Sequence, residues 1–394
     1  MDLSELIAHF ADNAPGFARR LARAGLQVED LRTSEELAAL PVMRRDELRA
    51  LQVADPPFGG LLACDPGELA FVFQAPGPIY VPGSRRSDAW NWRPALRAAG
   101  FANGDLVLNG FGYHLAPAGV MFEQALVALG CTVIPGGPDS VESQVEILDA
   151  LRITGYVGLP SQLKALLLRA EARNLRLCLQ TAFVAGEPLS RPLRTLFEER
   201  DLSVREGYGT VECGALGYEC ERQDGWHVPE DVLVDVCDPA SGDPLPPGAL
   251  GEVVITLLTP EHALVRFGLG DLSRLDRTPC PCGRPTPRLM GWQGRVGTAV
   301  KIRGIHLHPQ ALRRLMARFS EIVRFQAVIG RAEDKDTLAL RVVPVHRVTN
   351  VDTLPERVAR AIQSNLELLP EIEIVDASEL AVDAPPVVDL RIWR

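Results

Sequence analysis

Alternating strand-like and helix-like segments constrain the fold of this chain most strongly. From about residue 55 to about residue 235, short β-like runs alternate with stretches of helical spacing. In order, they are "LVLNGFGYHL", "PAGVMFEQALVALG", "CTVIPGG", "SVESQVEILDAL", "ITGYVGLP", "SQLKALLLRAEARN" and "TAFVAGEPLS". This order predicts a parallel sheet covered by helices, because parallel neighbours need a crossover connection. Ligands of such sheets bind at the carboxyl ends of the strands, where the Gly-containing turns fall.

The pattern changes on both sides of this region. Residues 1 to about 55 are predicted to be helical and amphipathic, with Asp2 or Ser4 near the first helix start. After "VPEDV", the stretch "VLVDVCDPASGDPLPPGALGEVVITLL" predicts β-hairpins, because Pro, Gly and Asp cluster between two apolar runs. Beyond about residue 300, the order helix, strand, strand, helix, strand predicts a compact α+β unit of about 90 residues.

Composition and charge narrow the class of protein. The 394 residues suffice for two or three domains, and 46% hydrophobic with 23% charged content is ordinary for a globular protein. A net charge of −10 argues against nucleic-acid binding through a basic field. No apolar run approaches the roughly 20 residues of a membrane span, and the N-terminus lacks signal-peptide character. We therefore expect a cytoplasmic protein with neither a nucleic-acid nor a membrane partner.

Four residues have the chemistry of a structural metal site. The eight cysteines are too few and too scattered for a disulfide scaffold. Cys220 and His227, followed about 50 residues later by Cys280 and Cys282 in "PCPCGR", supply three thiolates and one imidazole. This is a closed tetrahedral set typical of structural zinc, with no open position for a catalytic water. The alternative is four unrelated residues in a reducing compartment. The other cysteines, including Cys213, are interpreted as ordinary thiols.

One short stretch, "FQAPGPIYVPG" (residues 73–83), has the position but not the chemistry of a nucleotide loop. A turn that cradles phosphate uses glycines for close approach, hydroxyls as donors and usually a lysine. This stretch has two glycines and three prolines, and no Ser, Thr or Lys. Proline has no N–H to offer a phosphate. We therefore expect that it does not hold a triphosphate.

Four further segments carry a resemblance to a known family. They are "AGEPLS" (185–190), "EGYGTVECG" (206–214), "LVRFGLGDLSRL" (264–275) and "CPCGRPTPRLMGWQGRVGTAVKIRGIHLHPQAL" (280–312). In this order they resemble the adenine loop, the Y-G-x-[ST]-E motif, the ribose-binding segment and the cysteine pair with hinge of the phenylacetate–CoA ligase family. The resemblance covers nearly the whole chain.

The resemblance implies a fold and a reaction. It implies the adenylate-forming enzyme fold: an α/β N-terminal domain over 1–296, with a zinc knuckle over 220–282, and a small mobile α+β subdomain over 297–394. Such enzymes make an acyl adenylate and pyrophosphate from ATP and an acid, and coenzyme A then takes the acyl group. The implied partners are a small or aromatic carboxylic acid, AMP or ATP with Mg²⁺, and coenzyme A. Some members hold a structural zinc, and dimers are common, so a homodimer is possible.

For the adenosine end, the resemblance assigns several residues. Asp271 would accept from the ribose hydroxyls, although a turn aspartate is the alternative. Arg295 would lie beside the ribose or phosphate, or else be a surface charge of the hinge. Tyr208 would stack on adenine, with Gly209 allowing the ring to approach, whereas a simple turn is the other interpretation.

Four further roles follow from the same resemblance. The segment Glu187–Pro188 would wall the adenine, or only begin a helix. Glu212, the catalytic candidate, would bind Mg²⁺, or be a solvated glutamate. Tyr113 and His114 lie where the family has its acid pocket, although a loop histidine bonded elsewhere is the alternative. Lys301 would meet a coenzyme A phosphate, or lie on the solvated face of a strand.

The phosphate end departs from the family pattern. The family loop is of the S-S-G-T-T-G-K-P type. Aligned on Gly77 and Pro82, the positions of its hydroxyls, glycine and lysine carry Ala75, Pro76, Pro78, Ile79, Tyr80 and Val81. Val211 stands at the hydroxyl position of the Y-G-x-[ST]-E motif, one residue after Thr210.

The hinge and the terminus depart as well. Gly297 and Thr298 replace acidic residues of the hinge. The ending "VDAPPVVDLRIWR" has no lysine, although Arg391 and Arg394 are present. Each departure removes a group aimed at the triphosphate or at adenylation.

Two hypotheses result. The first is an AMP-forming acid–thiol ligase with impaired adenylation, since loss of one transition-state donor costs about 10²–10³ in rate. The second is a non-adenylating homologue that binds an adenylate, AMP or a CoA thioester, as an acyltransferase, a sensor or a partner subunit.

Overall fold

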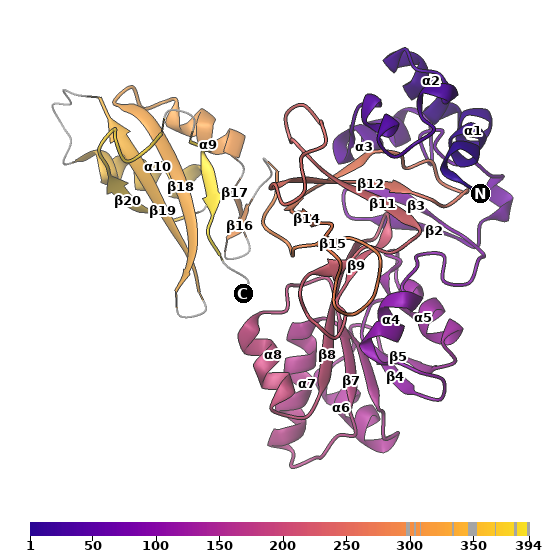
Figure 1. Cartoon of the computed structure of the whole chain (residues 1–394). Helices are drawn as coiled ribbons and strands as arrows, with labels where there is room; N and C mark the ends of the chain where they lie inside the picture. Colours follow the sequence, from indigo (N-terminus) through magenta and orange to yellow (C-terminus); the bar gives the residue numbers. More distant parts are fainter. Residues whose placement is uncertain are drawn as a thin grey trace. The chain divides into compact units, whose positions relative to one another are not determined.

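The chain folds into two compact units. The computed structural model describes residues 1–296, 300–302, 305–307, 309–332, 335–345, 353–366, 368–381 and 384–391. One unit spans Met1–Gln293 and the other begins at Gly294 (Figure 1). The division thus falls at 293/294, near the expected 296/297.

The larger unit is built on a nine-stranded sheet with the order β14-β15-β10-β9-β8-β7-β6-β4-β5. Its parallel strands are β4 (Leu106–Asn109), β5 (Thr132–Pro135), β6 (Gly155–Gly158), β7 (Thr181–Val184) and β8 (Ser203–Thr210). The antiparallel extension consists of β9 (Gly214–Tyr218), β10 (Trp226–His227), β14 (Leu275–Asp276) and β15 (Arg288–Leu289). The predicted helix-covered parallel sheet is confirmed.

Helices cover both faces of the parallel strands (Figure 1). On one face lie α4 (Arg93–Ala99) and α5 (Ala118–Ala128), and on the other α6 (Val141–Ala150), α7 (Pro160–Ala172) and α8 (Arg191–Glu198). Successive strand residues alternate between the two cores, as the two-residue period of a strand requires. Val107 packs with the α4–α5 core and Leu108 with the core of α6, α7 and α8.

A second sheet and the N-terminal helices complete this unit. The sheet has the order β1 (Met43–Arg44), β13 (Phe267–Ser273), β12 (Gly251–Leu257), β11 (Val232–Cys237). The helices are α1 (Leu3–Asn13), α2 (Pro15–Ala24) and α3 (Arg45–Ala54), with 3₁₀ turns at Val28–Asp30, Glu36–Ala39 and Pro66–Glu68. Asp2 and Glu5 form a reciprocal capping box at the start of α1. The predicted hairpin region and amphipathic N-terminal helices are confirmed.

The stretch 73–83 folds as a β-hairpin rather than as an open loop. Its strands are β2 (Phe71–Ala75) and β3 (Ile79–Gly83), and Ala75 pairs with Ile79 across the turn. Four alternating side chains point into the core, each at most 5% exposed: Phe73, Ala75, Ile79 and Val81. Packing into the core therefore uses positions where a phosphate loop would carry hydroxyl groups.

The smaller unit has its own core. It contains the sheet β20 (Glu371–Ile374), β19 (Lys335–Pro344), β18 (Ile322–Ala332), β21 (Val387–Asp389) and the hairpin β16 (Val300–Ile302) with β17 (Ile305–Leu307). Helices α9 (Pro309–Met316) and α10 (Leu354–Leu366) pack with the sheet through residues such as Leu312, Ile329 and Val358. The predicted order is confirmed, and β21 adds a strand that the sequence did not indicate.

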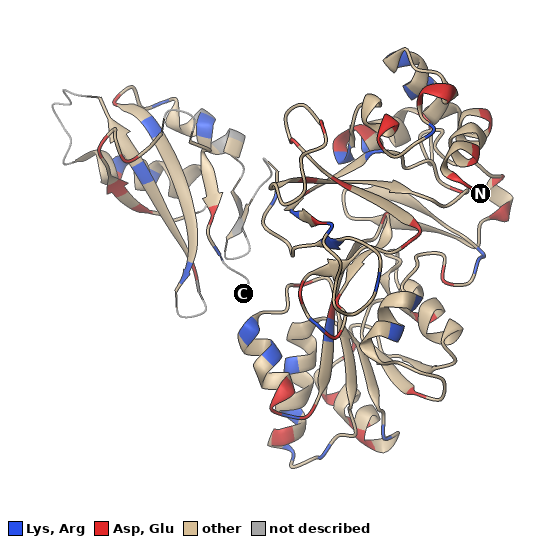
Figure 2. Ribbon diagram, viewed as in Figure 1, with Lys and Arg blue, Asp and Glu red and all other residues tan. Residues whose placement is uncertain are grey.

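Charged residues of both signs are interspersed over the helices of the larger unit (Figure 2). Many form ion pairs between neighbouring helices, such as Arg173 with Glu146 at 3.1 Å and Arg169 with Glu142 at 3.0 Å. Exposed pairs of this kind stabilise a fold little. Among the described residues, no helix combines the length and apolar character needed to cross a membrane.

A chain ended after Gln293 is expected to fold by itself. The two cores of the larger unit use no buried residue beyond Leu289, whereas the core of the smaller unit begins at Ile302. Circular dichroism and thermal unfolding of the shortened chain should therefore show one cooperative transition. Loss of the near-ultraviolet signal with strong binding of a hydrophobic dye would contradict independent folding.

Candidate functional site

Several residues singled out from the sequence lie at one edge of the parallel sheet. Tyr113 and His114 follow β4, the segment Glu187–Pro188 follows β7, and Gly209 and Glu212 lie at the end of β8. Because parallel strands end at the same edge, these turns belong to one end of the sheet. The candidate site is therefore the edge that the sequence analysis predicted.

At the adenosine end, Asp271 is engaged by two aromatic donors. The Tyr208 hydroxyl donates to Oδ2 at 2.8 Å, and the Trp292 indole donates to Oδ1 at 3.1 Å. Asp271 is only 4% exposed. The Asp271 carboxylate is thus buried and held in place by two donors from different segments. The structure thus brings the predicted pair Tyr208 and Asp271 together and adds Trp292.

The ring of Tyr208 packs on a second indole. Trp226 in β10 lies nearly parallel to it, with centroids 5.1 Å apart and an interplanar angle of 11°. One face of the tyrosine that was predicted to stack on adenine therefore contacts protein. The close approach of Gly209 to the backbone of Gly214 requires a glycine, because a Cβ added to Gly209 would lie 2.2 Å from the carbonyl oxygen of Gly214.

A buried pair of carboxyl groups, which sequence reasoning missed, supports this edge. Glu206 accepts from the backbone N–H of Leu189 at 2.7 Å, and its own N–H donates to Glu219 at 2.8 Å. Arg194 pairs with Glu219 at 2.6 Å. Burial, and then the charge of Glu219, raise the pKa of Glu206 to about 7. The pair ties the turn after β7 to β8, where Glu187 also accepts from the Ser161 N–H at 3.3 Å.

The hairpin 71–83 offers few free amide donors. The N–H of Gln74 donates to the Leu115 carbonyl at 2.9 Å. The Gln52 side chain accepts from the N–H of Tyr80 and donates to its carbonyl, both at 2.8 Å. Within the turn Pro76–Gly77–Pro78, only Gly77 has an amide hydrogen.

Glu212 lies beside the tip of this hairpin and forms an ion pair. Its Oε1 accepts from the Nη2 of Arg45, which also donates to the Pro76 carbonyl at 3.0 Å. Glu212 is 3% exposed, so the interpretation as a solvated glutamate is wrong. No sequence signal connects Arg45, at the start of α3, with Glu212.

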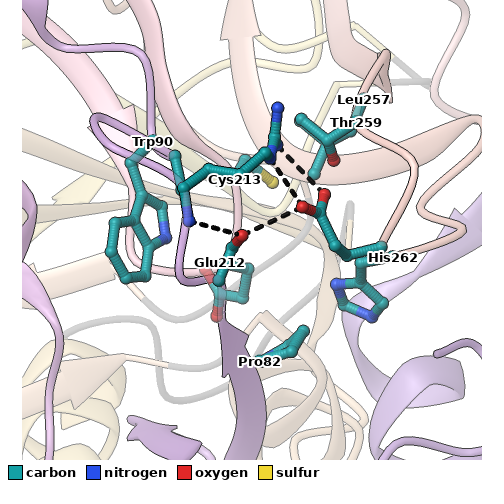
Figure 3. A pocket seen from close by; sticks show the side chains of 11 residues that line it. Pro82, Trp90, Glu212, Cys213, Leu257, Thr259 and His262 are labelled. Carbon is teal, nitrogen blue, oxygen red and sulfur yellow. Dashed lines mark hydrogen bonds and ion pairs between the residues drawn. The ribbon is translucent and has the colours of Figure 1, made fainter. Parts of the chain in front are cut away.

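Glu212 also lines a small pocket of mixed polar and apolar character (Figure 3). Arg86 binds Glu261 through two hydrogen bonds of 2.6 and 3.0 Å, and Ser84 donates to the same carboxylate at 2.9 Å. Glu212 Oε2 and His262 Nε2 have no hydrogen-bond partner among the described residues. The pocket, about 40 Å³ for the centres of water-sized molecules, has room for a few waters.

The four predicted zinc ligands come together. Their ligand atoms lie within 4.8 Å of one another, although Cys220 follows β9 and Cys280 and Cys282 follow β14. His227 accepts or donates at Nδ1 with Thr286 at 3.3 Å, while its Nε2 lies 3.3 Å from Cys282 Sγ. Three thiols and an imidazole without further ligands fit a closed structural zinc site.

Burial and hydrogen bonds shift the pKa values of the residues in this cluster in different directions. Burial raises the pKa of Cys220 to about 11 and lowers that of His227. For Cys282, desolvation is outweighed by hydrogen bonds from Arg284, which lower the pKa of its thiol to about 7. A divalent ion would stabilise the buried thiolate forms.

The other candidates lie apart from these interactions. Tyr113 is half-buried and accepts at its hydroxyl from Asn109 at 2.7 Å, whereas His114 is exposed. Burial, helped by Glu123, raises the pKa of Tyr113. The Tyr113 hydroxyl is thus bonded within its own turn.

In the smaller unit, Arg391 is 8% exposed and pairs with Asp336 at 2.9 Å and Asp389 at 2.6 Å. Arg295 is exposed, and Lys301 lies on β16 with a side chain outside the described residues. Gly297, Thr298 and Arg394 also fall outside them.

Comparison of the sequence with known proteins finds relatives along most of the chain. A family model described as "AMP-binding enzyme" matches residues 104–257. Phenylacetate-coenzyme A ligase of Thermus thermophilus is 30% identical over 380 residues, which cover 91% of this chain and 84% of the relative. The corresponding enzyme of Aromatoleum evansii is 27% identical, with 89% and 82% covered.

Solved structures agree with this result. A 2-hydroxyisobutyryl-CoA ligase in complex with 2-HIB-AMP and CoA superimposes with a TM-score of 0.73 at 25% identity. The match covers 99% of this chain and 88% of that one. An open conformation of the same ligase also gives a TM-score of 0.73. The expectation of an adenylate-forming fold is confirmed.

We expect about one zinc per purified chain, measured by mass spectrometry of the metal, because the cluster supplies four ligands. Cys280→Ala should lose the zinc and lower the melting temperature. Cys131→Ala is a matched control, since the two cysteines are 6% and 7% exposed and only Cys280 is in the cluster. A folded wild-type chain with less than about half an equivalent would contradict the site.

Acidification should destabilise the protein through His262. Burial lowers its pKa to about 4, so between pH 6.5 and 4 the unfolded chain binds a proton that the folded chain does not. The contribution of His262 to stability should fall by up to about 3 kcal/mol as the pH drops through this range. Denaturant unfolding at several pH values measures it.

His262→Gln should remove the His262 contribution to the change of stability with pH, whereas replacing the exposed His114 should leave that change as it is in wild type. Glu206, whose pKa is raised to about 7, contributes the opposite slope in all these proteins and cancels in the comparison. Equal slopes for wild type and His262→Gln would show that His262 titrates normally.

Proposed function

Because the chain belongs to the phenylacetate–CoA ligase family of adenylate-forming enzymes, we propose that it acts on the acyl group of a small or aromatic carboxylic acid together with coenzyme A, with its ATP-dependent adenylation strongly impaired. The acid class follows the names of its relatives: phenylacetate is aromatic, and 2-hydroxyisobutyrate is small and branched.

One observation carries the proposed impairment: the β2–β3 hairpin, at the expected phosphate end of the site, has almost no hydrogen-bond donors available to a phosphate. Its prolines lack N–H groups, and the N–H groups of Gln74 and Tyr80 already donate within the protein. The developing charge on a leaving pyrophosphate needs donors and a cation. The residues present do not fit a magnesium-bound triphosphate, and we derive no step that uses one.

The adenosine end fits a nucleoside better. An acyl adenylate, when bound, supplies an activated carbonyl that a thiol can attack. Asp271, which Tyr208 and Trp292 hold in place, is a buried carboxylate of the kind that accepts hydrogen bonds from ribose hydroxyls. The Glu206–Leu189 hydrogen bond holds the turn that would wall the base. In the acid pocket, Tyr113 would be oriented by Asn109.

A specific observation also favours the second hypothesis, a non-adenylating homologue that binds AMP, an adenylate or a CoA thioester. Arg391, the last described cation of the chain, is committed to Asp336 and Asp389, so it does not replace a terminal catalytic lysine.

Structural zinc at the cysteine cluster would join the β9–β10 connection to the segment after β14. We assign the metal no part in catalysis.

Two assays on the zinc-loaded chain test the proposed function. Pyrophosphate release from ATP with a panel of aryl and small acids should be weak, at least about 10²-fold slower than thioester formation from a supplied acyl adenylate and coenzyme A. Calorimetry with AMP, ATP and coenzyme A reports binding separately.

Pyrophosphate release as fast as thioester formation would overturn the impairment. AMP or coenzyme A binding without either reaction would favour the non-adenylating homologue. Asp271→Asn should weaken AMP binding, whereas Asp276→Asn, on a neighbouring strand away from Tyr208, should leave it unchanged.

A further inference from the structure

We propose that Arg45 is the resident cation of Glu212 and excludes a divalent metal ion from that carboxylate. The inference rests on the proposed function, because the family resemblance assigns Glu212 to Mg²⁺. It adds a specificity residue that the sequence motifs do not contain.

The contacts of Arg45 join three segments that are distant in the sequence. Its Nη2 donates both to Glu212 Oε1, at the end of β8, and to the Pro76 carbonyl, at the hairpin tip. Arg45 itself is the first residue of α3. The guanidinium therefore lies between the carboxylate that would bind a metal and the turn that would cradle its phosphates.

Burial makes this ion pair strongly coupled. The Glu212 side chain is 1% exposed and that of Arg45 37% exposed, so the arginine reaches inward from the surface. A buried carboxylate without a partner is strongly disfavoured. Among the described residues, Glu212 forms one ion pair, and this is with Arg45.

Around Glu212, the described residues supply no competing cation and no cluster of metal ligands, although Glu261 and His262 line the same pocket. On the pocket side of Glu212, the charge of Arg86 is taken by Glu261 through two hydrogen bonds. His262 is held neutral by its burial. Within the described residues, the single cluster of three or more potential metal ligands is the Cys/His set, and Glu212 is not part of it.

A divalent ion at Glu212 would therefore have to displace Arg45 or bind beside it. Mg²⁺ requires octahedral oxygen ligands at about 2.0–2.1 Å. The Oε1 of Glu212 is bonded to the guanidinium, and its Oε2, which has no hydrogen-bond partner among the described residues, is buried. Two cations on one carboxylate oxygen also repel each other. Arg45 thus both stabilises Glu212 and sets the metal preference of the site.

Manganese binding to the full-length, zinc-loaded chain tests the proposal without ATP or acid. Mn²⁺ prefers carboxylate and water ligands over thiolates, and free Mn²⁺ is counted by electron paramagnetic resonance. Arg45→Gln should bind one Mn²⁺ at least about tenfold more tightly than wild type. Arg49→Gln, an exposed arginine one turn later on α3, should not. The double variant Arg45→Gln/Glu212→Gln should lose the gain.

A comparison that leaves Arg45 in place keeps the test valid should its variant fail to fold. Glu212→Gln alone should leave the weak Mn²⁺ affinity of wild type unchanged, and a loss of affinity would overturn the proposal. A folded Arg45→Gln chain with wild-type affinity would also overturn it. Because no turnover is measured, rapid pyrophosphate release by wild type would refute the proposed function and leave this result standing.

Discussion

The burial of one face of the β2–β3 hairpin is the constraint on which the chemistry of this protein depends. Phe73, Ala75, Ile79 and Val81 alternate inward and are almost completely buried. The inward positions of these strands supply apolar side chains, so they cannot also carry the hydroxyls of a phosphate loop. Packing of this hairpin and the proposed impairment of adenylation therefore follow from one sequence pattern.

The neighbouring contacts complete the change. The Gln52 side chain forms hydrogen bonds with the N–H and the carbonyl of Tyr80. Arg45 donates hydrogen bonds to both the Pro76 carbonyl and Glu212. These interactions satisfy groups that a nucleotide-binding site leaves available. At the adenosine end, the Asp271 carboxylate is held by two aromatic donors, Tyr208 and Trp292, rather than by a charged partner of the kind that Arg45 is for Glu212. The two ends of the candidate site thus differ in the kind of partner that holds their carboxylate.

Much of the fold could be predicted because it depends on local patterns. Hydrophobic periodicity and turn residues predict the alternation of strands and helices, the capped first helix and the order of elements in the smaller unit. The cysteine spacing likewise indicated four residues that the structure brings within 4.8 Å of one another. The hairpin was interpreted as a loop, since its prolines and glycines outweighed its short apolar alternation.

The contacts of the site were not predictable in the same way. Arg45 and Glu212, Tyr208 and Trp226, and Glu206 and Glu219 lie on different elements, and no spacing rule relates an ion pair or a ring stack across such distances. Their meeting depends on how helix α3, the hairpin and the two ends of β8 pack.

By itself, the sequence determined most of the elements, the thiols and the imidazole that can share a metal, and the absence of hydroxyls and lysine from residues 73–83, because these properties belong to residue type and short-range order. Only the tertiary structure decided that Glu212 is buried against an arginine and that Asp271 already receives two aromatic donors. Desolvation and pairing are properties of the folded surroundings, and they arise only when distant segments come together.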